Sequence, residues 1–214
     1  MGSVEGSLTA VTGGGPVTVR SVRGEAVLET AGGDVTADSV VGMLRASTSG
    51  GAVRVGSAGG SVAATTGGGP IVIGRAVGIV TARNAAGPVQ VGAAGGVRAE
   101  SGTGAIKLAN VSGNMRVSTS VGSIIASLLG GRIAESFLST GNGDITVLIP
   151  SNLGVTIRAE NEMADTIQRI VSEFPGIPVR LEGTQVVAEG RINGGGPLLR
   201  ISGTGGTIFI KRQQ

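Results

Sequence analysis

Every charged side chain between residues 40 and 99 is an arginine, and this basic segment is the first place where the sequence could do chemistry. Guanidinium groups bind carboxylates and phosphates through paired hydrogen bonds, so the segment is a candidate surface for anionic polymers or lipid headgroups. Solvated charge that suppresses aggregation through strand edges is the interpretation that we favour. Tryptophan and tyrosine are absent, so single-stranded nucleic acid, which stacks on aromatic rings, is not expected as a partner. The arginines are Arg45, Arg54, Arg75, Arg83 and Arg98.

The acidic residues are poorly placed for hydrolysis by a carboxylate pair. Asp34 and Asp144 occupy equivalent positions of the repeat described below, six coils apart. At about 4.8 Å per coil they would be separated by roughly 30 Å, whereas a glycosidase needs about 5 to 10 Å. A Gly-Gly-Asp turn accounts for Asp34. The remaining enzymatic alternative is a polysaccharide lyase with Arg98 or Arg116 as its base, and we expect no enzyme.

Cysteine and histidine are both absent. Their absence removes disulfides, thiolate nucleophiles, the usual general base and the commonest metal ligand. The segment from Gly102 to Lys107 superficially resembles a phosphate-binding loop, but a strand pattern follows it where such a loop needs a helix. Calcium-binding nonapeptide repeats need an aspartate in every turn, which this chain lacks. The sequence therefore predicts no catalytic residue, no cofactor and no metal.

The elements that position these residues follow a regular repeat, in which a single step is one residue shorter than the others. Each repeat opens a short strand with valine or isoleucine, and a glycine recurs in the same frame. A period of about 18 residues is typical of a solenoid, in which each repeat forms one coil that stacks on the last. The strands open at Val17, Val35, Val53, Ile71, Val89, Ile106 and Ile124, and the glycines are Gly24, Gly42, Gly60, Gly78, Gly96, Gly113 and Gly131.

Equivalent residues of successive coils should form columns, because alternate side chains of a strand face opposite sides of the sheet. One column on the second strand places Arg98 beside Arg116. Together with Arg54 and Lys107, these two residues are the candidate contacts for an anion or glycan. Val72 and Ile125 are outward apolar residues and candidates for lateral self-contact. The outward column of the first strand reads Thr18, Thr36, Arg54, Val72, Gln90, Lys107 and Ile125.

A third column carries a hydroxyl or amide side chain just before each glycine-rich corner. Such side chains can hydrogen-bond along the solenoid axis and satisfy the backbone groups of the turn. We therefore predict an architectural role for Thr30, Thr48, Thr66, Asn84, Ser101 and Thr119.

The composition and the pattern together predict one all-β domain with a thin core. The chain has 41 glycines and three phenylalanines, so small aliphatic side chains must fill a narrow interior. Residues 1–10 form a lead-in to a β-solenoid over 11–214, with regular coils over 11–142 and a variant C-terminal cap region over 143–214. Residues 161–176 fit a short helix or an irregular strand pair. Uncharged runs are rich in Gly, Ser and Thr, which predicts no transmembrane segment.

Several motifs of the C-terminal part resemble those of the bacterial putative-adhesin β-strand-repeat family, a domain of unknown function. The resemblance implies a right-handed single-stranded β-solenoid in bacterial envelope or surface proteins, and it transfers no catalytic residues. It covers most of residues 11–212. The motifs are Gly143-Asp144-Ile145-Thr146-Val147-Leu148-Ile149-Pro150, Val155-Thr156-Ile157-Arg158-Ala159, Ser172-Glu173-Phe174-Pro175, Asn193-Gly194-Gly195-Gly196-Pro197 and Gly205-Gly206-Thr207-Ile208-Phe209-Ile210-Lys211.

These observations predict a non-catalytic, adhesin-like structural solenoid in the cell envelope or outside the cell. It would present a rigid surface to an envelope protein, a surface glycan or a second copy. Self-assembly into filaments by end-to-end stacking is one alternative, since solenoid ends expose strand edges. A module that binds anionic glycans or lipids through surface arginines is another. No signal peptide follows Met1, so export would need a leader outside these residues, and a cytoplasmic start is the alternative.

Overall fold

The repeat predicted from the sequence is present as a β-solenoid of about eight turns with coils of about 18 residues. The structure is a computed structural model that describes residues 2–130, 133–162 and 166–213. Two compact units divide the chain, residues 1–104 and residues 105–214. In the described ranges no helix is long and apolar enough to cross a membrane.

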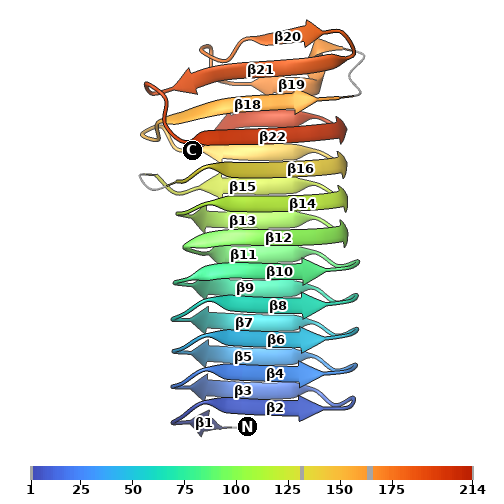
Figure 1. Ribbon diagram of the computed structural model, residues 1–214, viewed down its shortest axis with the longest axis vertical. Coiled ribbons are helices and arrows are strands. Elements are labelled where there is room, and N and C mark those ends of the chain that lie inside the picture. Colours follow the sequence, from blue (N-terminus) through green and yellow to red (C-terminus); the bar gives the residue numbers. More distant parts are fainter. Residues whose placement is uncertain (1, 131–132, 163–165, 214) are drawn as a thin grey trace. The chain divides into compact units, whose positions relative to one another are not determined.

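In the first unit each coil contributes one strand to each of two parallel sheets. In Figure 1 the nearer strands of this unit run to the right and the farther ones to the left as the chain climbs, so the coil is right-handed. One sheet contains β1 (Ser3–Val4), β3 (Val17–Val22), β5 (Val35–Val40), β7 (Val53–Ala58), β9 (Ile71–Ala76) and β11 (Val89–Ala93). The other contains β2 (Leu8–Thr12), β4 (Ala26–Thr30), β6 (Leu44–Thr48), β8 (Val62–Thr66), β10 (Ile79–Asn84) and β12 (Gly96–Thr103).

The second unit also has two sheets, but its last coils do not stack in chain order. One sheet runs β13 (Ile106–Val111), β15 (Ile124–Leu128), β17 (Ile145–Ile149), β23 (Ile208–Arg212), β19 (Ile170–Ser172). The other runs β14 (Met115–Val121), β16 (Ser136–Asn142), β22 (Leu198–Gly205), β18 (Val155–Asn161), β21 (Gln185–Ile192), β20 (Val179–Glu182). Residues 198–212 therefore fill a coil between residues 136–149 and residues 155–172. Strands β18, β21 and β20 pair in antiparallel fashion, in contrast to the parallel coils.

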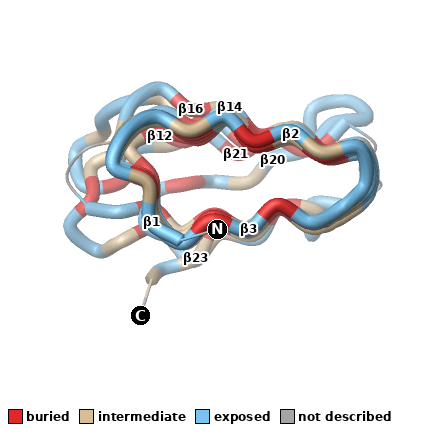
Figure 2. The backbone as a smooth tube through the Cα atoms, turned by 90° about the horizontal axis from the view of Figure 1, so that it is seen from below, coloured by how far each residue is buried: buried red, intermediate tan, exposed pale blue. Residues whose placement is uncertain are grey.

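The core is a double row of small aliphatic side chains that alternate with exposed positions along each strand. Val17, Val35, Val53, Ile71 and Val89 are in register on neighbouring strands, as predicted, and all are buried. Figure 2 shows buried positions alternating with exposed ones along the strands. Stacking of identical positions explains why a thin core suffices, because each buried side chain contacts its equivalents in the coils before and after it.

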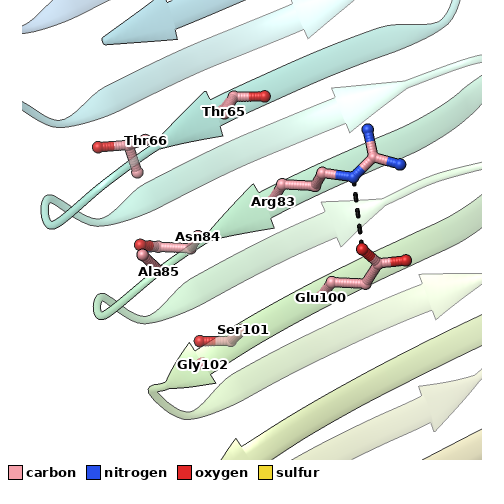
Figure 3. A pocket seen from close by; sticks show the side chains of 8 residues that line it. All are labelled: Thr65, Thr66, Arg83, Asn84, Ala85, Glu100, Ser101 and Gly102. Carbon is pink, nitrogen blue, oxygen red and sulfur yellow. Dashed lines mark hydrogen bonds and ion pairs between the residues drawn. The ribbon is translucent and has the colours of Figure 1, made fainter. Parts of the chain in front are cut away.

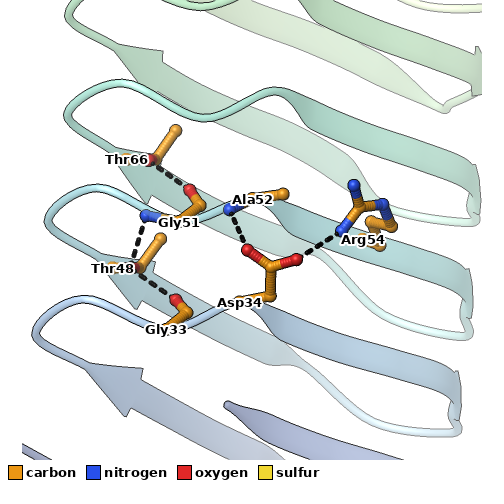
Figure 4. A network of polar contacts seen from close by, with 7 residues as sticks. All are labelled: Gly33, Asp34, Thr48, Gly51, Ala52, Arg54 and Thr66. Atoms are coloured by element: carbon orange, nitrogen blue, oxygen red, sulfur yellow. Dashed lines mark hydrogen bonds and ion pairs between the residues drawn. The ribbon is translucent and has the colours of Figure 1, made fainter. Parts of the chain in front are cut away.

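The two strands of a coil are joined by a glycine-rich corner, and one buried polar side chain per coil fastens this corner to the previous coil. Thr48 Oγ1 donates a hydrogen bond to the carbonyl oxygen of Gly33 at 2.8 Å and accepts one from the amide of Gly51 at 3.1 Å. Thr66 donates in the same way to Gly51 at 2.7 Å (Figure 4). This confirms the predicted ladder, whose buried members in the first unit are Thr30, Thr48, Thr66, Asn84 and Ser101.

Glycine is required at this corner because successive backbones approach each other closely. A Cβ atom at Gly51 would lie 2.1 Å from the carbonyl oxygen of Gly33, and one at Gly69 would lie 2.1 Å from that of Gly51. Neither separation is compatible with van der Waals contact. By contrast, a Cβ atom at Gly50 would meet nothing within 4 Å.

The glycine frame predicted from the sequence needs one correction. The amide of Gly95 donates to the carbonyl of Gly78 at 3.1 Å, whereas Gly96 is in register with Ile79. Gly95 therefore takes the position predicted for Gly96, and the short coil loses its residue in the turn between β11 and β12. Gly131, the last glycine of the predicted frame, lies outside the described residues.

The described residues of the range 161–176 adopt neither of the two predicted forms completely. The 3-10 helix η1 (Ile167–Arg169) is three residues long and leads directly into β19. Met163, one of the residues at helical spacing, lies outside the described residues. Ile170 is buried in β19, whereas Ile167, in η1, and Val171, the next residue of β19, are exposed. The apolar residues at helical spacing therefore do not form one buried helical face.

Replacing Gly51 with alanine should destabilise the first unit by about 1–3 kcal/mol or more, because the backbone of the neighbouring coil must move. Gly50→Ala is the matched control and should leave stability unchanged or raise it by about 0.4–1 kcal/mol. Urea unfolding followed by circular dichroism measures both. Equal midpoints for the two variants would contradict the close approach.

Replacing Thr66 with valine should destabilise the chain by about 1–3 kcal/mol, because the carbonyl of Gly51 and the amide of Gly68 lose a buried partner. The adjacent Thr65 is exposed, so Thr65→Val should change stability by less than about 0.5 kcal/mol. The comparison uses unfolding midpoints, since a repeat protein need not unfold in two states. A similar loss in both variants would show that the hydroxyl of Thr66 is not what matters.

Candidate functional site

The most concentrated group of charges in the first unit joins two arginines to one carboxylate on β10 and β12. Arg83 lies in register with Glu100, and its Nε donates to Glu100 Oε2 at 3.3 Å. Arg98, two residues before Glu100, donates from Nε to Glu100 Oε1 at 3.1 Å. All three side chains are about half exposed to solvent. The group therefore carries one net positive charge and not the two that an acid-free segment would give.

A shallow hollow lies beside this group (Figure 3). Its volume is about 420 Å³. Three of its polar side chains belong to the corner ladder and already bond to backbone carbonyls of glycine, which leaves little for a bound molecule. The hollow therefore follows from the corner architecture. It is lined by Thr65, Thr66, Arg83, Asn84, Ala85, Glu100, Ser101 and Gly102.

Arg54 is also engaged by an acidic residue. Its Nη1 atom lies 2.8 Å from Asp34 Oδ2, and Asp34 Oδ1 accepts a hydrogen bond from the amide of Ala52 at 2.8 Å (Figure 4). The amide of Ala52 and the guanidinium of Arg54 lower the pKa of the Asp34 carboxyl, the amide contributing most. The candidate anion contact at Arg54 is thus occupied by the chain's own carboxylate.

Asp144 repeats the backbone role of Asp34 in the second unit. Its Oδ1 atom accepts from the amide of Thr207 at 2.8 Å, as Asp34 accepts from Ala52. Both aspartates therefore tie a turn to the next coil of the stack. Among the residues that the structure describes, no three histidine, cysteine, aspartate or glutamate side chains are grouped as metal ligands.

The other candidate residues are placed on separate surfaces. Val72 in the first unit is half-buried between Arg54 and Gln90 of the neighbouring strands. Lys107 and Ile125 are in register in the second unit, where Ile125 is 39% exposed. Val72 and Ile125 thus belong to different units.

Arg116 has neighbours that the sequence did not predict. On the outward face of the second unit, one row of residues in register crosses four adjacent strands. The row contains Arg116 of β14, Phe137 of β16, Arg200 of β22 and Arg158 of β18. Arg98, the predicted neighbour of Arg116, belongs to the first unit. The Arg200 position was missed because β22 is inserted between β16 and β18, although it follows both of them in the chain.

The two arginines lower the pKa of the Glu100 carboxyl, and the hydrogen bond from Arg98 is the largest cause. Since the folded pKa is lowered, the stabilisation is complete above the unfolded pKa and is lost as the pH falls through the folded value. Arg98→Gln should therefore raise the pKa of Glu100 more than Arg83→Gln does. Carboxyl ¹³C NMR titration measures both, and the reverse order would contradict the geometry.

Comparison with known proteins finds no relative of this chain. The chain matches no family model, no curated protein and no solved structure. Any function assigned to it has to come from the geometry of its own residues.

Proposed function

We propose that this chain is a non-catalytic structural β-solenoid of a bacterial cell envelope or of a secreted protein. In the manner of an adhesin, it would hold a flat sheet surface rigidly so that another molecule can contact it. The observation that carries this proposal is that the polar side chains bond to the backbone of the chain itself. The buried threonine and asparagine side chains of the ladder and the two equivalent aspartates all bond to backbone groups of adjacent coils.

The charged groups support a role in binding another molecule more than a role in catalysis. The carboxyl groups with lowered pKa, Asp34 and Glu100, are exposed members of ion pairs on a sheet surface. Catalytic groups commonly have their pKa shifted by burial in a cleft. Fixed side chains on a stiff sheet favour binding, because little conformational entropy is lost when a partner is bound.

Discrete particles are favoured over filaments by the last strands of the second unit. β19 has three residues and β20 has four, and both lie at the edges of their sheets. Arg180 and Glu182 of β20 form an ion pair at the exposed edge. Short and charged edge strands disfavour the addition of another strand. Growth by stacking at this edge is therefore disfavoured.

Negative-stain electron microscopy across a concentration series, with light scattering alongside, should find discrete particles at every concentration. Regular filaments with an axial repeat of one chain length would instead support the assembly alternative. The variant R180Q/E182Q removes the charges of β20 without changing the net charge. It should increase association relative to the parent chain if these charges block the edge.

Fractionation of a bacterium that carries the natural gene should place the protein in the envelope or in the medium. An antibody against the folded chain measures its amount in each fraction, with a cytosolic enzyme and an envelope protein as markers. Recovery with the cytosolic marker alone would overturn the proposed location.

A further inference from the structure

From the outward face of β14, β16 and β22 in the second unit, we infer a binding site for a carboxylate-bearing polysaccharide. This inference rests on the proposed function, since it names the partner that the rigid surface would contact. We call this surface the Arg116 face and define it by Arg116, Ser118, Phe137, Ser139, Arg200 and Ser202.

The first row of the face alternates cation, ring and cation. Arg116, Phe137 and Arg200 are in register on three adjacent strands, with Phe137 half-buried and the two arginines exposed. The two arginine backbones are thus about 10 Å apart, twice the strand spacing. Both guanidinium groups project from the same side of one sheet, because residues in register share a face.

Among the residues that the structure describes, both arginines of this row lack an acidic partner, as Arg45 and Arg75 of the first unit do, but only this row has an aromatic ring between its two cations. Arg23, Arg54, Arg83, Arg98, Arg158 and Arg180 each form an ion pair with a glutamate or aspartate. Within the described residues, neither Arg116 nor Arg200 forms one. Their hydrogen-bond donors therefore remain available to an external anion, to which a guanidinium group can donate two parallel bonds.

The half-buried aromatic ring between them differs from the other two phenylalanine rings of the chain, each of which lies under a cation. Lys211 lies over the ring of Phe209 at 4.9 Å, and Arg212 lies over that of Phe174 at 5.3 Å. In the described part of the chain no cation covers Phe137. The apolar side of a sugar ring can pack on such a surface, while the sugar's charged groups reach the flanking arginines.

A second row of hydroxyl groups runs beside the first. Ser118, Ser139 and Ser202 are in register two residues along the same strands, and all three are half-buried. Each hydroxyl can donate and accept a hydrogen bond, which suits the hydroxyl groups of a sugar. The row ends at Glu160, which is in register with Ser202 and pairs with Arg158 at 2.6 Å. This ion pair bounds the basic surface on the side of β18.

The arrangement favours a polysaccharide over the other anionic polymers. The strand spacing of about 4.8 Å is comparable to the advance per sugar unit in an extended chain. Successive sugar units of a chain that crosses the strands can therefore lie over Arg116, Phe137 and Arg200 in turn. A single phenylalanine provides no series of stacking platforms for bases, as single-stranded nucleic acid needs. A lipid surface would favour a cluster of apolar side chains, whereas hydroxyl groups occupy the second row here.

Binding of fluorescent polygalacturonate to the full chain tests this site, with the methyl ester of the same polymer as the neutral comparator. The double variant R116Q/R200Q should weaken binding at least about tenfold, because each arginine loses a charge-assisted hydrogen bond. R45Q/R75Q removes the same charge from the first unit, taking the net charge from +3 to +1. It should weaken binding less than about threefold, an effect of general electrostatics.

Ser139→Asp provides a second, independent test, because it places a negative charge in the centre of the face without altering an arginine. It should weaken polygalacturonate binding as strongly as the double variant, with an unchanged melting temperature. Equal weakening by R45Q/R75Q, or equal binding of the methyl ester, would overturn the site. So would tighter binding of phosphatidylglycerol vesicles or single-stranded DNA through the same arginines. None of these results affects the fractionation or the particle measurements, so the site and the proposed function fail separately.

Discussion

The close approach of successive backbones at the glycine-rich corner is the constraint on which the rest of the structure depends. Gly51 and Gly69 leave room for the carbonyl of the coil before, and the hydroxyl of a threonine satisfies that carbonyl from inside the corner. A polar group is thereby buried with its partner at each coil, which removes the desolvation penalty of a free carbonyl. The strands then fall into register, and the narrow aliphatic core and the outward rows follow from that register.

The regular coils could be predicted almost completely from the sequence, because one repeating frame fixes the strand, the corner and the facing of each side chain. Val17, Val35 and Val53 lie where that frame puts them. The order of the last coils could not be predicted, since nothing in the local pattern indicates that β22 lies between β16 and β18. That order depends on long-range packing of residues 155–192, which a periodic pattern does not encode.

The basic segment over residues 40–99 shows how a residue just outside a segment can change its interpretation. The acid-free run ends at Ala99, and Glu100, the next residue, binds both Arg83 and Arg98. Asp34, which precedes the run, binds Arg54. The sequence pattern makes Arg116 a candidate because of Arg98, whereas the structure places Phe137 and Arg200 in register with it. Chain order alone could not place Arg200 beside Phe137, because β22 follows β18 in the chain but lies between β16 and β18 in the sheet.

The insertion of residues 198–212 among earlier coils also affects the order in which the protein can fold. Each regular coil can pair with its predecessor as soon as it leaves the ribosome, because its partners lie in the repeat just before it. Asp144 and Thr207, by contrast, are 63 residues apart. Strands β18 and β19 therefore keep one edge unpaired until β22 and β23 of the last coil are synthesised. Contacts over such distances form slowly, so this region is where interrupted synthesis would leave the chain most exposed to aggregation.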